Sequence, residues 1–173
     1  MMKNKFTTNR DTFVFNTPLE VGLRALMILN ELSPSLIDLN RLVIYDYLVT
    51  HSSDVDTNVE SLHPSIPNRS GEIIIKRKVM QEGIDLMYSR ELVEIVYTKG
   101  GVSYRANDLS AYFIDYFDSI YAREIRNYSH WLNETFSHLS DKELEEYIDE
   151  NIHKWGSEFT KESLVRGGFD RDE

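Results

Sequence analysis

Residues 92–108, LVEIVYTKGGVSYRAND, decide the fold of this chain. Apolar residues alternate with polar ones on both sides of Lys99, Gly100 and Gly101, which is the pattern of two strands joined by a tight turn. Glycine adopts the positive φ angles that such a turn requires. Asn107 or Asp108 then supplies an N-cap for a helix. The stretch therefore predicts a β-hairpin followed at once by a helix.

Three helices are predicted before this hairpin. In NTPLEVGLRALMILNEL, Thr17 is placed as N-cap, Pro18 as the first helical residue and Glu20 as the partner in a capping box. SLIDLNRLVIYDYLVTH predicts a second helix, and a long polar loop over residues 51–70 follows it. GEIIIKRKVMQEGIDLMYSREL predicts a third helix, although its β-branched run at residues 73–75 also fits a strand.

A helical period continues after the hairpin. It predicts one long helix from Leu109 to Phe136, with Phe113 and Ile120 in phase with Leu109 and therefore in the core. A second capping box at residues 140–143 predicts a last helix that reaches about residue 153.

This order predicts a mainly α fold with a small β-hairpin. Helix, helix, helix and hairpin is the order of a winged-helix domain, here followed by a long helix and a C-terminal helical extension. The predicted parts are an N-terminal arm (1–16), a winged-helix-like domain with a long 51–70 loop (17–108), C-terminal helices (109–155) and an acidic tail (156–173).

The charge of the chain is strongly negative but uneven. The formal net charge of the 173 residues is −10. Residues 69–105 carry seven Lys and Arg against five Asp and Glu, whereas residues 140–173 carry five against eleven. No apolar run reaches the ~20 residues of a membrane span, and residues 1–10 lack the apolar core of a signal peptide. We expect a soluble, cytoplasmic protein.

Patterns of catalytic chemistry are missing from the sequence. It contains no glycine-rich phosphate loop, no Gly-x-Ser-x-Gly elbow and no His-Glu-x-x-His pair. It also contains no cysteine, which excludes a disulfide framework, a thiolate metal site and a thiol nucleophile. His51, Asp54, Asp56 and His63 have metal-ligand chemistry, but their spacing matches no known site. We expect no enzyme activity, no cofactor and no metal.

One set of basic residues falls where winged-helix proteins contact DNA. Lys76, Arg77 and Lys78 lie on the predicted third helix, Lys99 lies at the hairpin tip, and Arg105 lies nearby. These five side chains are the candidate phosphate contacts. The alternative is that these basic residues only form an ordinary solvent-exposed surface and contact no DNA.

The aromatic content of residues 112–136 suggests an interface. The segment contains eight aromatic side chains, spread over more helix faces than one small core can cover: Tyr112, Phe113, Tyr116, Phe117, Tyr121, Tyr128, Trp131 and Phe136. The excess rings either pack on the last helix or bind a partner, because interfaces are enriched in such residues. Tyr121, Tyr128 and Trp131 are the candidates for a partner face.

The chain resembles a known family over about residues 13–136. TPLEVGLRALMILNELSPSLIDLNRLVIYDYLVTH and LVEIVYTKGGVSYRANDLSAYFIDYFDSIYAREIRNYSHWL are similar to middle component 2 of ABC-three component systems, which include the small subunit of Lamassu-type defence systems. The resemblance implies a non-catalytic adaptor. It would bind an SMC- or Rad50-like ATPase and couple it to an effector, often a nuclease, in antiviral or anti-plasmid defence. The hairpin would then dock protein, with DNA contact secondary or indirect.

A free-standing winged-helix DNA-binding regulator is the alternative from another class. Such a protein would use the third helix and the hairpin directly. Its reading face is usually basic, and the rest of this chain is acidic. The sequence does not identify the effector, the trigger, the stoichiometry or the surface that each partner binds.

The adaptor reading predicts that the isolated chain binds duplex DNA weakly at physiological salt, because its net negative charge repels phosphates. Fluorescence anisotropy with a labelled duplex measures this. Sequence-specific binding near the nanomolar range would favour the regulator instead. Lys76→Ala and Arg77→Ala would then each flatten the salt dependence by about one unit.

Overall fold

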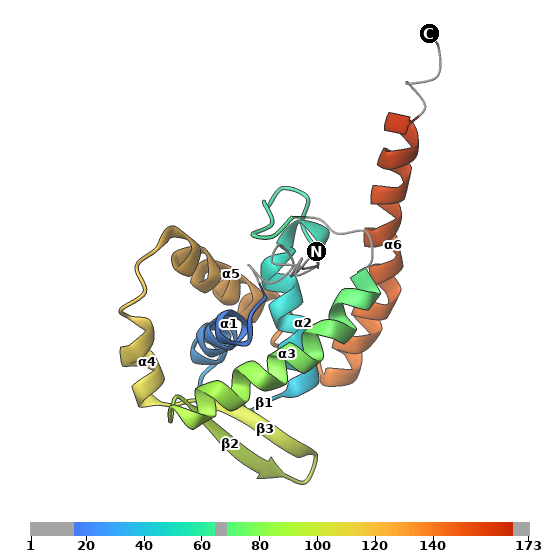
Figure 1. The fold of residues 1–173 in the computed structure, drawn as a ribbon. Coiled ribbons are helices and arrows are strands. Elements are labelled where there is room, and N and C mark those ends of the chain that lie inside the picture. Colours follow the sequence, from blue (N-terminus) through green and yellow to red (C-terminus); the bar gives the residue numbers. More distant parts are fainter. Residues whose placement is uncertain (1–15, 65–68, 168–173) are drawn as a thin grey trace, which may run out of the picture.

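A computed structural model describes residues 16–64 and 69–167 of the chain. The fold is mainly α with one small sheet, as predicted (Figure 1). Its elements follow in the order α1 (Pro18–Glu31), β1 (Ile37–Asp38), α2 (Leu39–Thr50), the 3₁₀ helix η1 (Ser52–Asp54), α3 (Arg69–Ser89), β2 (Val93–Thr98), β3 (Gly101–Ala106), α4 (Asp108–Ile114), α5 (Ile120–Phe136) and α6 (Asp141–Gly167).

The helix starts follow from short polar motifs. Thr17 caps α1 by accepting a hydrogen bond from the backbone N–H of Glu20, and Pro18 is the first helical residue. The carboxylate of Glu20 does not complete the predicted capping box, because it pairs with Arg24 instead. Asn107 caps α4 in a complete capping box with Ser110.

The sheet contains three antiparallel strands in the order β1-β3-β2. The hairpin pairs Ile95 with Tyr104 and Tyr97 with Val102, and Gly101 takes a φ of 124° at the turn. β1 pairs with the other side of β3, placing Ile37 opposite Tyr104. This two-residue strand was not predicted from the sequence. It joins the hairpin to the segment between α1 and α2 in one sheet.

The core forms where α1 crosses α2, α3 and α5. Its largest fully buried apolar side chains include Leu26, Leu29, Leu48, Met80 and Ile84. The crossing of α1 and α3 brings two backbones together at Gly22 and Gly83. A Cβ atom at Gly22 would lie 2.6 Å from the carbonyl oxygen of Gly83. Only glycine allows this approach, so the pair sets the depth to which α1 and α3 pack.

The single long helix predicted from Leu109 is wrong, because two helices occupy that stretch. α4 ends at Ile114, and Ser119 caps a new helix by accepting a hydrogen bond from the N–H of Ala122. The break changes which residues face inward. Leu109 and Ile120 are exposed and Phe113 is half-buried. The buried apolar positions are Ile114, Ala122, Ile125, Leu132 and Phe136.

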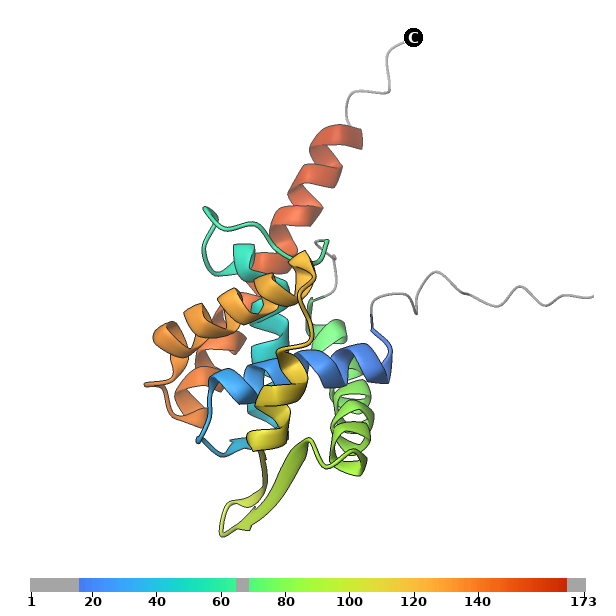
Figure 2. The same ribbon diagram turned by 90° about the vertical axis from the view of Figure 1, so that its left-hand side faces the viewer.

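The last helix is longer than predicted. α6 runs past residue 153 and through part of the predicted tail, to Gly167. Its second half extends away from the other helices, and the hairpin extends from the opposite end of the molecule (Figure 2). No helix among the described residues is both long and apolar enough to cross a membrane. Most of the predicted arm, part of the predicted 51–70 loop and the end of the tail lie outside the described residues.

Replacing Gly22 with alanine tests the contact between α1 and α3. The added Cβ collides with backbone, which cannot rotate away, so Gly22→Ala should lower the free energy of unfolding by roughly 1–3 kcal/mol. Urea denaturation measures this loss. Gly100→Ala is the matched control, because its Cβ would meet no described atom closer than 3.7 Å. Equal stability of the two variants would contradict the packing argument.

Candidate interaction surfaces

Lys76 is buried, which corrects the prediction that it lies on an exposed, DNA-facing surface. Its side chain is turned toward α2, where Nζ donates hydrogen bonds to Oδ2 of Asp46 at 3.0 Å and to Oγ1 of Thr50 at 3.1 Å. Met80, Ile84 and Met87 are buried on the inner face of α3. Lys76 lies one turn before Met80 on that same face, so its side chain also points into the core.

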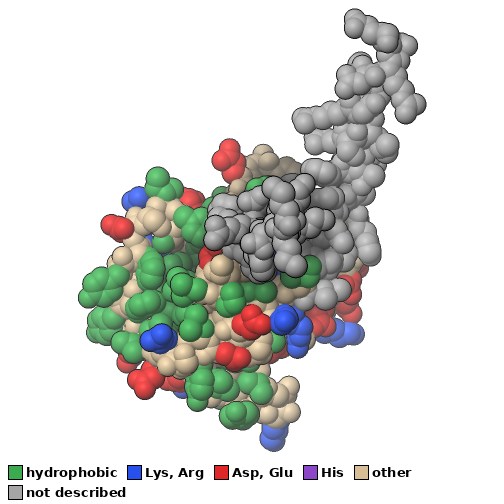
Figure 3. Space-filling model, in the orientation of Figure 1, with side chains coloured by type: hydrophobic (Ala, Val, Ile, Leu, Met, Phe, Trp, Pro, Cys, Tyr) green, Lys and Arg blue, Asp and Glu red, His purple; other side chains and the backbone are tan. Residues whose placement is uncertain are grey.

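The other four predicted DNA contacts do not form a continuous basic surface. Arg77, Lys78 and Lys99 are exposed, but Lys78 lies 3.9 Å from Glu82. Arg105 pairs across the hairpin with Glu94 at 2.7 Å. On the face shown in Figure 3, Lys and Arg side chains are separated by acidic and hydrophobic ones. Direct contact of these residues with DNA stays a prediction.

One face of the hairpin is apolar and reaches beyond the core. The pairs Val93–Ala106, Ile95–Tyr104 and Tyr97–Val102 lie on the same face, because side chains alternate along a strand. Val93 is buried at the base of the hairpin, while Tyr97 is 81% exposed and Val102 is 41% exposed toward the tip. The hairpin therefore presents an aromatic and an aliphatic side chain to solvent beside Lys99.

The three aromatic residues predicted to bind a partner have contacts inside the chain. The Tyr121 hydroxyl lies 2.8 Å from Nε2 of His63, and the Tyr128 hydroxyl donates to the carbonyl of Glu60 at 2.6 Å. Trp131 packs edge-on against Phe136 at 6.0 Å between ring centroids. The two tyrosines thus hold the loop after α2 against α5. Their binding to a partner stays a prediction.

The most exposed aromatic residues of this segment lie on and just after α4. Leu109, Tyr112 and Tyr116 follow one another at helical spacing, and Ile120 begins α5. All four are large, apolar in character and exposed. Figure 3 shows hydrophobic side chains gathered over α4 and the neighbouring ends of α5 and α1. Sequence reasoning missed this surface because it assumed an unbroken helix, although Asp118-Ser119 is a recognisable helix start.

Three helices meet at a buried ion-pair network. Arg24 of α1 donates to Asp46 of α2 twice, from Nε at 2.7 Å and from Nη2 at 3.1 Å, and Lys76 of α3 donates to the same carboxylate. Burial raises the pKa of Asp46, but the positive charges of Arg24 and Lys76 outweigh it and hold the pKa well below its ordinary value. Asp46 therefore stays ionised inside the core.

The loop residues with metal-ligand chemistry have other contacts. His51 is buried and stacks on Tyr47 at 4.9 Å between ring centroids, and the Tyr47 hydroxyl donates to the carboxylate of Asp54. Asp56 accepts a hydrogen bond from the N–H of Asn58. Among the side chains that the structure describes, no group of three or more His, Asp or Glu residues is placed to hold a metal ion.

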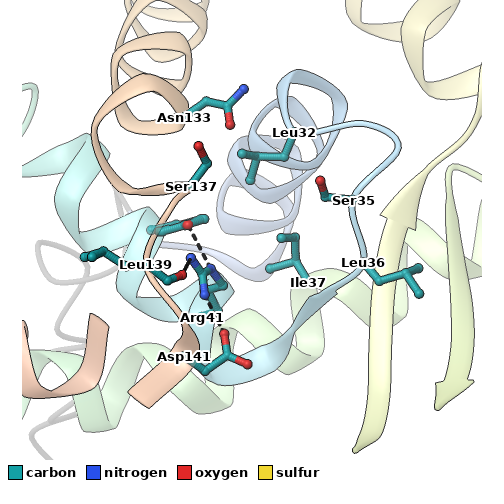
Figure 4. Close-up of a pocket in the computed structure, with 10 residues that line it drawn as sticks. Leu32, Ser35, Leu36, Ile37, Arg41, Asn133, Ser137, Leu139 and Asp141 are labelled. Carbon is teal, nitrogen blue, oxygen red and sulfur yellow. Dashed lines mark hydrogen bonds and ion pairs between the residues drawn. The ribbon is translucent and has the colours of Figure 1, made fainter. Parts of the chain in front are cut away.

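A surface pocket of about 190 Å³ lies between the segment that joins α1 to α2, the start of α2, and the end of α5 with its turn into α6 (Figure 4). Arg41 lies against it, and each of the three guanidinium nitrogens donates at least one hydrogen bond within the chain. Nε donates to the Tyr45 hydroxyl, Nη1 to Asp141 at 2.6 Å, and Nη2 to the carbonyls of Phe136 and Leu139. The pocket is a structural joint between helices rather than an anion site.

A comparison with protein-family models matches residues 14–158 to the ABC-three component (ABC-3C) system Middle Component 2. The match covers most of the chain, including every helix and strand from α1 to α5. No curated protein and no solved structure matches the chain.

The burial of His63 predicts a pH dependence of stability. Burial, followed by the charges of Arg24 and Lys76, lowers the pKa of His63 from 6.5 to about 4, and Asp46 opposes this. Between these two values the unfolded chain binds a proton that the folded chain does not, so stability falls as pH falls from about 6.5 to about 4. Urea denaturation across this range measures the loss, and His63→Gln should reduce it.

His130 provides the control for this experiment. It is exposed, and its hydrogen bond to Glu31 raises its pKa, so its contribution to stability is lost as pH rises. His130→Gln should therefore leave the acid-side loss of stability in place. If His63→Gln shows the same acid-side loss as the parent chain, the assignment to His63 is wrong.

Proposed function

Because the chain belongs to the family of ABC-three component (ABC-3C) system Middle Component 2, we propose that it is a non-catalytic subunit of a multi-component complex. In this proposal it binds an SMC- or Rad50-like ATPase and couples it to an effector, often a nuclease. The setting is prokaryotic defence of the Lamassu type, in the cytoplasm. The chain contributes docking surfaces and needs no cofactor.

The apolar face of the hairpin carries this proposal. A hairpin tip that contacts DNA places cations against phosphates. This tip instead exposes Tyr97 and Val102 beside the single cation Lys99. Tyrosine is enriched among the residues that supply most of the binding energy where proteins bind each other. The feature supports a winged-helix-like domain whose hairpin docks protein.

The distribution of charge supports the same proposal over the DNA-binding regulator. Of the five basic residues in the predicted DNA-contacting set, Lys76 is buried, and Lys78 and Arg105 have acidic neighbours. Few cations remain for counterion release, which supplies most of the affinity of non-specific DNA binding. The net charge of −10 opposes DNA at longer range.

Co-expression with an SMC- or Rad50-like ATPase and an effector of an ABC-three component system from the same source tests the proposal. We expect the three proteins to purify as one complex and the chain alone to hydrolyse neither ATP nor DNA. Tyr97→Ala should weaken the complex by about 2 kcal/mol or more if Tyr97 is an interface anchor. The melting temperature of the Tyr97→Ala chain alone should not change, because the Tyr97 side chain is 81% exposed.

Tyr88→Ala is the matched control for Tyr97→Ala. Tyr88 is a second tyrosine, 53% exposed, on α3 rather than on the hairpin. We expect the complex with Tyr88→Ala to purify at the parent yield. A chain that purifies alone and binds duplex DNA tightly would contradict the proposed function.

A further inference from the structure

The strand β2 forms one edge of the sheet. In the order β1-β3-β2 it pairs with β3 on one side, and no described element lies alongside its outer side (Figure 1). The opposite edge is different, because β1 covers β3 where Ile37 pairs with Tyr104. Over its six residues, Val93–Thr98, β2 therefore presents an open row of backbone N–H and C=O groups.

The register of the hairpin decides which backbone groups point outward. Thr98 pairs with Gly101 across a turn of only two residues, and a pair that flanks so short a turn exchanges hydrogen bonds directly. Bonded and non-bonded pairs then alternate along the ladder. The backbone groups of Val93, Ile95 and Tyr97 therefore point to the open edge, and no other backbone group in the described part of the chain bonds to them.

This edge lacks the features that normally keep the edges of sheets apart. Exposed edges are usually interrupted by proline, by a bulge or by lysine. The sequence of β2, VEIVYT, contains no proline and no lysine, and its pairing with β3 runs from Val93–Ala106 to Thr98–Gly101 without a bulge. Its single charged residue, Glu94, is paired within the hairpin with Arg105. The edge of β2 can therefore accept another strand.

A second copy of β2 fits this edge when the two strands run antiparallel around a two-fold axis at Ile95. Ile95 then lies opposite Ile95 of the second copy, and Val93 lies opposite Tyr97 of the second copy. Each of the three outward pairs exchanges two hydrogen bonds, roughly six in total. Paired residues point to the same face of a sheet, so Tyr97, which is 81% exposed, gains Val93 of the second copy as an apolar neighbour.

The charged residues also fit this register. Glu94 lies opposite Val96 of the second copy, and not opposite a second Glu94, which would repel it. Beyond the strand ends, Lys99 of one copy comes level with Glu91 of the other. Both are exposed, and neither forms an ion pair among the described residues. Arg90, next to Glu91, is exposed as well, so the strand hydrogen bonds contribute more than this contact.

We propose that two copies of this chain pair antiparallel through the open edges of β2 and form one sheet across both molecules. A two-fold axis uses the same edge on each copy, so the assembly closes as a dimer and leaves no open β2 edge. The inference goes beyond the proposed function and does not depend on it. A partner that binds side chains on the apolar face of the hairpin leaves the backbone edge free, and pairing places two such faces side by side.

Sedimentation of the purified full-length chain over a range of concentrations tests the inference. We expect a reversible equilibrium between monomer and dimer that shifts toward dimer as salt is added, because salt screens the repulsion between two acidic copies. Ile95→Pro should give a monomer, since it removes the two central hydrogen bonds and leaves the ladder to β3 intact. An Ile95→Pro chain that dimerises like the parent would overturn the inference.

Charge substitutions at Val96 test the register without changing the hairpin backbone. Val96 is half-buried and lies opposite Glu94 of the second copy in the proposed pair. Val96→Lys should lower the Kd of the dimer about fivefold and Val96→Glu should raise it about fivefold, because the two-fold axis creates each cross-strand charge pair twice. Ala111→Lys and Ala111→Glu make the same charge changes on the exposed surface of α4, and they should change the Kd much less.

These outcomes are separate from those of the proposed function. They are measured on the chain alone, so a failure to bind the ATPase leaves them unchanged. If Val96→Lys and Val96→Glu shift the equilibrium in the same direction, the strands do not pair in this register and the inference is wrong. If the parent chain is a monomer at every concentration, no second copy occupies the edge of β2, and the inference is wrong as well.

Discussion

The carboxylate of Asp46 is the interaction on which the rest of the structure depends. It lies fully buried where α1, α2 and α3 meet, and it accepts hydrogen bonds from Arg24 and Lys76. A charge in this position is tolerated only when its partners are in place, since an unpaired buried ion costs several kcal/mol. The network therefore favours the observed register of the three helices, because another register would separate an ion from its partner.

The network also explains why part of the sequence misleads. Lys76, Arg77 and Lys78 form a basic run, yet successive residues of a helix point about 100° apart. One of the three must therefore face a different way from its neighbours. The phase of Met80 and Ile84 identifies Lys76 as the inward residue. That signal is present in the sequence, but only a carboxylate on another helix makes it physically reasonable to bury an ammonium.

Capping residues, turn residues and hydrophobic periodicity predicted most helices and the hairpin. The features that the sequence did not predict depend on contacts between distant parts of the chain. The hairpin, the caps at Thr17 and Asn107 and the order of the first helices depend on neighbouring residues, so they could be predicted. The strand β1 has two residues and exists only because β3 offers it an edge. The break before Ser119 was missed because the aromatic residues on both sides still fit a helical period. Because the break was missed, the exposed surface of α4 was missed too. A continuous helix would have turned part of that surface inward.

The joint at Arg41 has a mechanical consequence for α6. Hydrogen bonds from the two terminal guanidinium nitrogens of Arg41 join α2 to the end of α5, the following turn and the first residue of α6. Buried Leu144, Ile148 and Ile152 hold the first half of α6 in the core, so only the roughly 12 residues after Trp155 form a lever, which spans about 18 Å. A rotation of about 10° where the helix leaves the core would move its far end by about 3 Å, given a rise of 1.5 Å per residue. The contacts that hold the first half of α6 thus govern where its far end lies.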